Sequence, residues 1–376
     1  MKAAKSPRLT SELHNVEFDH DDLEAIYKYT MAHGWGDGLP VVPPTPERVA
    51  AMLAGTGRSR DEEIATVAPA YGAATVEKIA INAVMAGCLP EHLPVVIAAV
   101  EACAAPEFNL YGIQATTNPV APLVLVNGPI RLRLGFNSGG NALGQGNRAN
   151  ATVGRALRLV LINLGGGRPG QIDFATLGFP GKYTLCCAEN EEANPWQPHH
   201  VTEGLAAEQS AVTVFGVQAL HNIVGIGIQG KGRDALRMIG LGMAAVGTNN
   251  MTFGGQALVL LCPEHVAAIA NEGFSKPEAS HFLYEHSRIS FRDLPEGSRQ
   301  VVLGRRARWL NSDAVTVADS ANDVQLVVVG GVGDHSVFAP SFGTTRSVTR
   351  AIQDSGADPG SAGAQMEGRT SDNDSV

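Results

Sequence analysis

The sequence predicts an α/β fold built from repeated strand-to-helix units, with glycine-rich loops where the strands end. Short apolar runs alternate with amphipathic segments along the 376 residues, and the 43 glycines gather in clusters beside those runs. Aromatic residues make up only 6% of the chain. The core must therefore consist mainly of Val, Leu, Ile and Ala, as is usual where helices cover a buried sheet.

The first unit occupies residues 40–55 and the clearest parallel to it occupies residues 258–273. In the first, residues 40–43 read as a short strand, and Pro46 and Glu47 open a helix that stops at Gly55. In the second, a strand over 258–262 precedes a helix that opens at Pro263. Both contain the word Pro-Glu-x-Val-Ala-Ala, which indicates an internal duplication, although generic helix-start chemistry accounts for the shared word nearly as well.

The remaining elements follow the same rules. Apolar runs predict strands over 123–126, 183–187 and 325–329, and helical periodicity predicts helices over 90–103, 151–164 and 234–246. We divide the chain into an N-terminal segment, a first α/β unit, a second α/β unit that holds the candidate active-site loop, and a disordered tail of Gly, Ser, Asp and Ala, with the bounds 1–30, 31–175, 176–354 and 355–376.

Composition and charge exclude several functional classes. The formal charge of −9 and the pI near 5.7 argue against nucleic acid or an anionic membrane as partner. No apolar run approaches the roughly 18 residues of a membrane span, and the first residues lack a signal-type apolar core. Five cysteines, an odd number in a long chain, indicate free thiols. These features predict a cytoplasmic globular protein, and its Gly- and Ala-rich helices favour a homo-oligomer.

The strongest functional signal is the segment 183–203. Two cysteines, Cys186 and Cys187, end the predicted strand, and the polar loop after it carries potential bases and orienting groups, Glu189, Glu191, Glu192, His199 and His200. Catalytic groups gather on loops of this kind. Three interpretations stay open: a cysteine nucleophile with a histidine base, a metal site in which zinc is bound by Cys, His199, His200 and Glu203, and a structural strand followed by a solvated acidic loop.

Two further loops are candidates for binding an acidic group. Residues 137–150 form a glycine-rich loop that leads into the helix at 151, an arrangement that offers free backbone N–H groups to an anion, with Ser138, Asn141, Asn147 and Arg148 as candidate ligands. Residues 330–349 form a glycine-punctuated turn with His335, Ser336, Ser341 and Arg346 as candidates. Thr117, Asn118, Thr248 and Asn249, which precede two predicted strands, complete the candidate binding set. Plain structural turns remain the alternative in each case.

A third glycine-rich turn, residues 229–234, is a weaker candidate of the same kind. In it, Asp234 would cap the following helix.

Several longer words carry a resemblance to a known group. These are Gly-Trp-Gly-Asp-Gly-Leu-Pro-Val-Val-Pro-Pro-Thr-Pro-Glu-Arg-Val (34–49), Cys-Ala-Glu-Asn-Glu-Glu (187–192), Pro-Glu-His-Val-Ala-Ala-Ile-Ala-Asn-Glu-Gly-Phe-Ser-Lys (263–276), Phe-Leu-Tyr-Glu-His-Ser-Arg-Ile (282–289) and Val-Val-Val-Gly-Gly-Val-Gly-Asp-His-Ser (327–336). With them the chain resembles bacterial proteins that are similar to the larger components associated with the UGSC-type (seleno)proteins. The chain has no Cys-Gly-Ser-Cys word. The resemblance therefore implies that any redox centre of that type belongs to a separate partner.

These observations predict a small-molecule enzyme, a hydrolase or lyase that acts at a carbon–heteroatom bond of an acidic substrate. Cys186 or Cys187 would be the nucleophile, His199 or His200 the base, and the glutamates would carry or orient protons. The alternative from another class is a non-catalytic subunit that binds a substrate or a (seleno)protein partner. A metal-dependent hydrolase is a further alternative.

Overall fold

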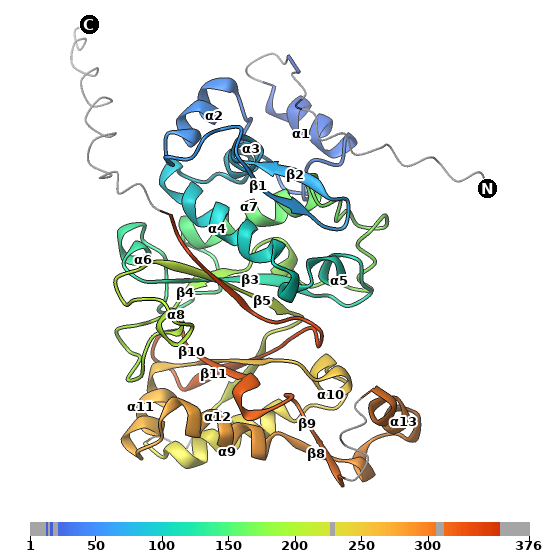
Figure 1. Cartoon of the computed structure of the whole chain (residues 1–376), viewed down its shortest axis with the longest axis vertical. Coiled ribbons are helices and arrows are strands. Elements are labelled where there is room, and N and C mark those ends of the chain that lie inside the picture. The colour runs from blue at the N-terminus through green and yellow to red at the C-terminus, as the bar shows by residue number, and fades with distance from the viewer. Residues whose placement is uncertain (1–12, 14–15, 18–21, 226–229, 306–311, 354–376) are drawn as a thin grey trace, which may run out of the picture.

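The molecule consists of two four-stranded sheets packed face to face, with a layer of helices on the outer side of each (Figure 1). The computed structural model describes residues 13, 16–17, 22–225, 230–305 and 312–353. Side chains from both sheets form a shared core between them, which includes Leu125, Cys187, Phe215, Leu260 and Val327. The α/β fold class predicted from the sequence is confirmed.

The first sheet has the strand order β12-β5-β3-β4, with the bounds Val348–Ala351, Ala211–Val217, Ala121–Asn127 and Cys186–Ala188. Strand β3 is parallel to β4 and antiparallel to β5, and β5 is antiparallel to β12. Every residue of β3, β4 and β5 is buried, because the second sheet covers one face and helices cover the other. These helices are α3 (Val76–Ala86), α4 (Leu93–Ala104) and α7 (Arg148–Asn163).

The second sheet repeats this arrangement. Its strand order is β6-β11-β7-β10, with the bounds His221–Val224, His335–Pro340, Ala257–Leu261 and Val324–Val328. Strand β7 is parallel to β10 and antiparallel to β11, which is antiparallel to β6. Helices α9 (Gly232–Met243), α11 (Pro263–Asn271) and α12 (Lys276–His286) cover its outer face. The matching order and directions are what an internal duplication would produce, while duplication at the level of sequence stays a prediction.

The two halves exchange their edge strands. The chain passes from β5 in the first sheet to β6 in the second, and from β11 in the second sheet to β12 in the first. Where these passages cross, Gln218 N–H donates to the carbonyl of Pro340 and Phe342 N–H donates to the carbonyl of Gly216. The predicted boundary at residue 175 is therefore wrong for the sheets, because β4, β5 and β12 all follow it in the chain and belong to the first sheet.

Most element predictions agree with the structure to within a few residues, and three need correction. Residues 40–43, predicted as a strand, form neither a strand nor a helix in the described structure. The strand predicted over 183–187 is β4, Cys186–Ala188, because Tyr183 ends the short helical turn Pro180–Lys182. Helix α7 begins at Arg148, three residues before the predicted start, because the Asn147 side chain accepts the N–H of Asn150 and caps it.

The remaining elements surround these layers (Figure 1). They are α1 (Leu23–Ala32), α2 (Pro46–Leu53), β1 (Glu63–Val67), β2 (Gly72–Thr75), α5 (Leu110–Gln114), α6 (Ile130–Arg133), α8 (His199–Thr202), α10 (Asn249–Phe253), β8 (Arg288–Ser290), β9 (Ala314–Thr316) and α13 (Glu296–Arg305). The tail predicted over 355–376 lies outside the described residues.

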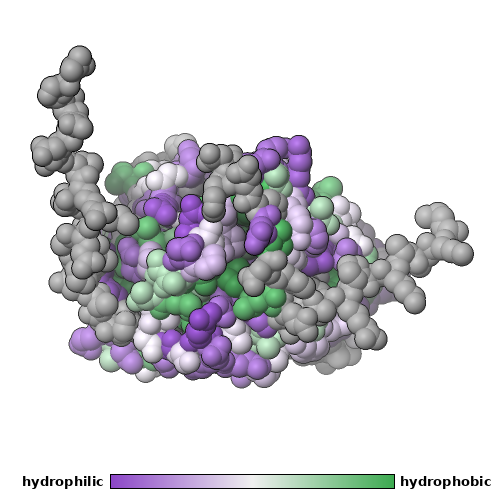
Figure 2. Space-filling model, turned by 90° about the horizontal axis from the view of Figure 1, so that it is seen from above, coloured by the Kyte–Doolittle hydropathy of each residue, from purple (hydrophilic) through white to green (hydrophobic). Residues whose placement is uncertain are grey.

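Two surface properties bear on the class of protein. Within the described ranges, no single helix is long and apolar enough to cross a membrane. Two consecutive helices, 90–104 and 106–114, would together be long and apolar enough, but the chain bends by 73° between them. Figure 2 shows the end of the molecule that carries α1 and α2, where apolar side chains gather at the centre of the face between polar groups. Exposed apolar residues of this end include Leu39 and Val42.

Candidate functional site

The loop after β4 closes the edge between the two sheets. Its first residue, Glu189, donates its N–H to Val126 of β3, and its second, Asn190, donates its N–H to Val328 of β10 over 2.7 Å. The Asn190 amide also donates to the carbonyl of Gly330. The loop thus joins the carboxyl ends of β4 and β10.

Glu189, the first residue of this loop, is completely buried. Its carboxylate accepts hydrogen bonds from the Asn127 amide at 2.5 Å, the Asn194 amide at 2.9 Å and the backbone N–H of His199 at 2.7 Å. Burial raises the pKa of Glu189, although these donors and Lys276 act in the opposite direction. A carboxyl group in this state can hold or pass on a proton.

Glu191 and Glu192 anchor the loop. The guanidinium of Arg131, on α6, donates to both oxygens of Glu192 and lies 3.3 Å from Glu191. Glu191 also accepts the N–H of Gly128 at 2.7 Å. The hydrogen bond from Arg131 lowers the pKa of Glu192. Both carboxylates are therefore committed to holding the loop on β3 and α6, and Glu191, a predicted catalytic residue, has a positional role in the structure.

His199 and His200 begin the short helix α8 and are almost completely buried. Within the described part of the chain, none of their four ring nitrogens has a hydrogen-bond partner. The closest carboxylates are Glu203, 3.9 Å from Nε2 of His199, and Glu191, 4.0 Å from Nδ1 of His200. Burial lowers the pKa of His199 to about 3, so this imidazole is neutral at physiological pH. Unused donor and acceptor nitrogens in a closed interior favour a bound water or a ligand group.

Lys276, which is not among the residues predicted from the sequence, acts electrostatically on both Glu189 and His199. It is the first residue of α12, where Ser275 and Glu278 form a capping box. Its Nζ is buried and has no hydrogen-bond partner among the described residues. Burial lowers the pKa of Lys276, and the charges of Glu189 and Glu203 raise it. A lysine in the first turn also opposes the helix dipole, and this unusual position was the signal available in the sequence.

A pocket of about 450 Å³ opens beside this group. Lys276 and Glu203 lie in its wall, and burial raises the pKa of Glu203 although Lys276 lowers it. The other lining residues come from α8 and the loop before it, from α12, and from the start of β10 and the turn before it, and are Trp196, Gln197, Thr202, Pro277, Ser280, Asn322, Val324, Gln325 and Leu326. We call Lys276, Glu203, Glu189 and His199 the acid–base group. A small molecule in the pocket can therefore reach Lys276 and Glu203 of the acid–base group.

The two predicted nucleophiles lie elsewhere in the packing. Cys186 belongs to the core between the first sheet and its helices, and Cys187 to the core between the sheets. Burial raises the pKa of Cys186 well above its usual value and that of Cys187 to about 12. No hydrogen bond joins either thiol to a histidine in the described residues. The geometry therefore does not support a cysteine nucleophile, because neither thiol would be ionised near neutral pH.

The glycine-rich loop before α7 uses its polar groups internally. Asn141 donates to the carbonyl of Gln145, Asn147 donates to Gly135 and caps α7, and Arg148 donates to Gly87. The carbonyl of Ser138 accepts the N–H of Gly330, and a Cβ on Gly331 would lie 2.9 Å from Gly140. This loop and the Asn190 loop therefore both contact the loop after β10, and these contacts are made by backbone atoms packed closely together.

Other predicted binding residues lie at the opposite end of the sheets. Thr117 accepts the N–H of Thr176 with its carbonyl, and Asn118 donates to Gln218. Thr248 donates to Ala245. The remaining contacts there join Asn249 to Gly343 N–H, Ser341 to Asn250 and Gln256, and Arg346 to Asp319 and Asp323. The contacts of Asn118, Asn249, Ser341 and Arg346 fasten the crossing passages between the sheets. None of the residues at this end is brought to the acid–base group.

The predicted pair His335 and Ser336 starts β11. His335 contacts the Asn222 side chain, and the Ser336 hydroxyl lies 2.8 Å from Nδ1 of His265 and accepts the N–H of Cys262. These contacts join β11 to β6 and to the start of α11. The contacts of Ser336 with His265 and Cys262 form a second buried polar cluster, separate from the pocket, whereas the contact between His335 and Asn222 is exposed.

The turn before α9 does hold a carboxylate, but one from the chain itself. Glu272 accepts the N–H groups of Gly232 and Arg233 at 2.8 and 2.9 Å, and Lys231 occupies the cap position expected for Asp234. Gln229, in the same predicted turn, lies outside the described residues. The anion-binding chemistry predicted for this turn is thus satisfied internally.

No set of three or more His, Cys, Asp or Glu side chains in the described ranges is placed to hold a metal ion. The zinc set predicted from His199, His200, Glu203 and a cysteine is therefore not assembled. Comparison with family models, curated proteins and solved structures finds no match to this chain. The resemblance to proteins associated with the UGSC type stays a prediction.

Proposed function

We propose that this chain is a lyase that removes a heteroatom group from a small acidic substrate, with Lys276 as general base and Glu203 as general acid. The observation that carries the proposal is the buried amine of Lys276, which has no hydrogen-bond partner among the described residues and lies in the wall of a pocket beside Glu203. Catalytic acids and bases need pKa values moved toward the working pH, and burial moves both groups in that direction.

The reaction follows from these two groups. The neutral amine of Lys276 takes a proton from the carbon next to the substrate carboxylate, and the electrons of that C–H bond form a carbon–carbon double bond. The carbon–heteroatom bond breaks, and the leaving group takes the proton of the Glu203 carboxyl. The enzyme is left with an ammonium and a carboxylate, and transfer of one proton between them restores the starting state.

The surrounding residues support this assignment. Amide side chains of Gln197 and Asn322 in the pocket lining can donate to a substrate carboxylate without adding charge. Glu189 and His199 lie behind Lys276 and are electrostatically coupled to it. A small acid fits a pocket of about 450 Å³, which lies in the usual range for small-molecule sites.

Elimination is favoured over covalent hydrolysis because the buried thiols offer no nucleophile. The test is to incubate the protein in D₂O with a panel of small 3-hydroxy-, 3-amino- and 3-sulfanyl-carboxylic acids, and to measure deuterium at the 2-carbon and unsaturated product by mass spectrometry. Lys276→Met should lower both rates by about 10²- to 10⁴-fold. Glu203→Gln should slow elimination while deuterium exchange continues, because only bond cleavage needs the acid.

Lys78→Met is the matched control, because the Lys78 amine donates to Ala73 in the outer helix layer, away from the pocket. An unchanged rate in Lys276→Met would contradict the proposal. Saturable binding of a panel acid without exchange or elimination would favour the non-catalytic binding subunit instead.

A further inference from the structure

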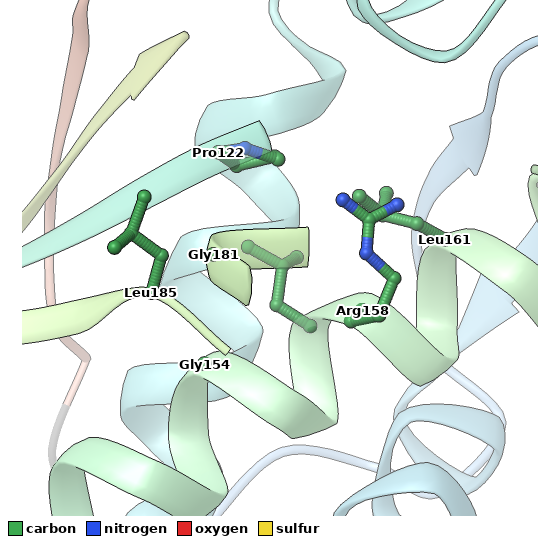
Figure 3. A pocket seen from close by; sticks show the side chains of 7 residues that line it. Pro122, Gly154, Arg158, Leu161, Gly181 and Leu185 are labelled. Atoms are coloured by element: carbon green, nitrogen blue, oxygen red, sulfur yellow. The ribbon is translucent and has the colours of Figure 1, made fainter. Parts of the chain in front are cut away.

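The space beside Arg158 leaves no room for a further ligand. Arg158 is almost completely buried on α7, and its Nε donates to the carbonyl of Lys182 at 2.8 Å. Figure 3 shows its guanidinium beside Leu161 and Pro122 on the border of this space. The volume of about 10 Å³ is that of one water-sized group, so the space belongs to the packing of α7 against the first sheet. A surface of another kind lies at one edge of the second sheet.

The two sheets have four edge strands, and the chain covers three of these edges with its own groups. An uncovered edge presents unbonded N–H and C=O groups and is a template for pairing with another strand. On β10, β4 and β12, outward backbone groups are bonded by Ser280 to Val324, by Asn137 to Ala188 and by Arg350 to Thr349. The fourth edge is β6.

Strand β6, His221–Val224, is an open edge. Gly225, just after it, donates its N–H to the carbonyl of Asp334 in the antiparallel ladder with β11. Because backbone groups alternate in direction along such a ladder, Asn222 and Val224 turn their N–H and C=O groups away from β11. Both residues are exposed, and no described residue bonds to these outward groups. The strand also lacks the Lys and Pro residues that commonly protect an edge.

Helix α9 extends this edge on one face of the sheet. A Cβ on Gly242 would lie 2.8 Å from the Ile223 side chain, so the helix lies directly over β6. A Cβ on Gly240 would lie 3.0 Å from His286, so α12 covers another side of the helix. Four exposed residues at the spacing i, i+3, i+4 and i+7 share a third side, which we call the α9 flank: Asp234, Arg237, Met238 and Leu241.

The α9 flank is complementary to a copy of itself. Met238 and Leu241 are 41% and 60% exposed and provide apolar area. Asp234 and Arg237 carry opposite charges, and neither forms an ion pair within the part of the chain that the structure describes. Two flanks that meet about a two-fold axis therefore bury apolar side chains together and offer each charge an opposite one.

We propose that two copies of this chain form a dimer through β6 and the α9 flank. Antiparallel pairing of β6 with β6 of the second copy has two-fold symmetry, so one surface serves both partners. With Ile223 at the axis, Asn222 of each copy lies opposite Val224 of the other, and the outward N–H and C=O groups of both strands are bonded.

The two sheets of the dimer continue into each other across the axis. A four-residue strand spans only about 13 Å, and a stable dimer buries about 800 Å² on each partner. The α9 flank is therefore a required part of the interface. The inference is independent of the proposed lyase reaction, whose pocket lies at β10, the other edge of this sheet.

Sedimentation velocity of the full chain at several micromolar concentrations tests the association. The wild type should sediment as a dimer. Val224→Lys on the open edge and Leu241→Asp on the flank should each raise the dissociation constant about 10-fold or more. Val332→Lys and Leu132→Asp, at positions that are 93% and 65% exposed elsewhere on the surface, should leave it unchanged. A monomeric wild type, or a dimer that Val224→Lys or Leu241→Asp leaves unchanged, would overturn the inference.

An engineered disulfide tests the pairing itself. The two Ile223 residues form a non-hydrogen-bonded pair at the axis, with Cα atoms about 4.5 Å apart, which is within disulfide range. Ile223→Cys should form a covalent dimer on mild oxidation, whereas the wild type, whose cysteines are buried, and the control Val332→Cys should not. A folded Ile223→Cys protein without covalent dimer would contradict the pairing, and the sedimentation result decides if this variant does not fold.

Discussion

Glu189, Lys276 and His199 share one physical situation, in which burial holds an ionisable side chain away from its charged form. Burial raises the pKa of Glu189, lowers that of Lys276 and lowers that of His199 to about 3. The charges of Glu189 and Lys276 act against each other's shifts, whereas the charge of Lys276 lowers the pKa of His199 further. Burial thus moves the pKa values of Glu189 and Lys276 in the direction that proton transfer to and from a substrate requires, while His199 stays neutral.

The buried imidazole predicts a pH dependence of stability. In the unfolded chain His199 titrates near its ordinary pKa of about 6.5, whereas the folded value is about 3. Between these values the unfolded state binds a proton that the folded state does not, so the free energy of unfolding falls as the pH falls from 6.5. For this one residue the loss between pH 6.5 and pH 5 is about 2 kcal/mol.

Denaturant unfolding at several pH values checks this expectation. His199→Gln should lose that part of the pH dependence, while His221→Gln, at an exposed position of β6, should keep it. A His199→Gln curve parallel to the wild type between pH 5 and 6.5 would show that His199 is not buried as a neutral group.

Residue types and spacing could identify part of the site. The density of polar residues after β4 predicted a site in the loop that holds Glu189 and His199, and the structure buries both side chains. The sequence could not show that both faces of β4 are covered, one by α7 and the other by the second sheet, so it could not predict the burial of both cysteines. Lys276 was not singled out because it lies 87 positions after Glu189, on a helix that covers the other sheet. Only the tertiary fold brings these two side chains together.

At the scale of elements, helix starts could be predicted best. Pro46 and Pro263 each mark a predicted helix that the structure contains. Such signals are local, so no knowledge of packing is needed. The strand expected over 40–43 failed for the opposite reason, because a strand exists only where another segment pairs with it.

Helix α9 shows how a predicted anion site can be satisfied by the chain itself. The Glu272 carboxylate accepts two backbone N–H groups at the start of α9. We expect Glu272→Ala to lower the free energy of unfolding by about 2 kcal/mol, because two charge-assisted hydrogen bonds and a favourable dipole interaction are lost. Chemical denaturation measures the change.

Glu208→Ala, at an exposed loop position, is the matched control and should have an effect below about 0.5 kcal/mol. Equal effects of the two substitutions would mean that Glu272 does not stabilise α9.

At the scale of the whole molecule, the exchanged edge strands tie the two halves together. The chain reaches one edge strand of each four-stranded sheet directly from the other sheet: it enters β6 from β5 and β12 from β11. The two sheets also share a core. The sequence indicated repeated units but not this exchange, because pairing between β12 and β5, more than 130 positions apart, leaves no local signal. A division of the chain at one residue could therefore not describe the fold.

This connection predicts that the two halves unfold together. Trp35 packs against the core of the first half and Trp196 against that of the second. In one variant Trp309 and Trp196 are replaced by Phe, so that Trp35 reports the unfolding of the first half. In the other variant Trp309 and Trp35 are replaced by Phe, so that Trp196 reports the unfolding of the second half. The two fluorescence midpoints in denaturant should coincide. Clearly separate midpoints would show that the halves are independent domains.

The measurement that tests the central claim most directly is the pKa of Lys276, obtained by pH-resolved reductive methylation with mass-spectrometric assignment. In the folded protein the midpoint for Lys276 should lie below that of the same residue in the urea-unfolded chain. It should fall further in Glu203→Gln, because Glu203 raises the pKa of Lys276. A folded midpoint equal to or above the unfolded one would contradict the assignment of Lys276 as the base.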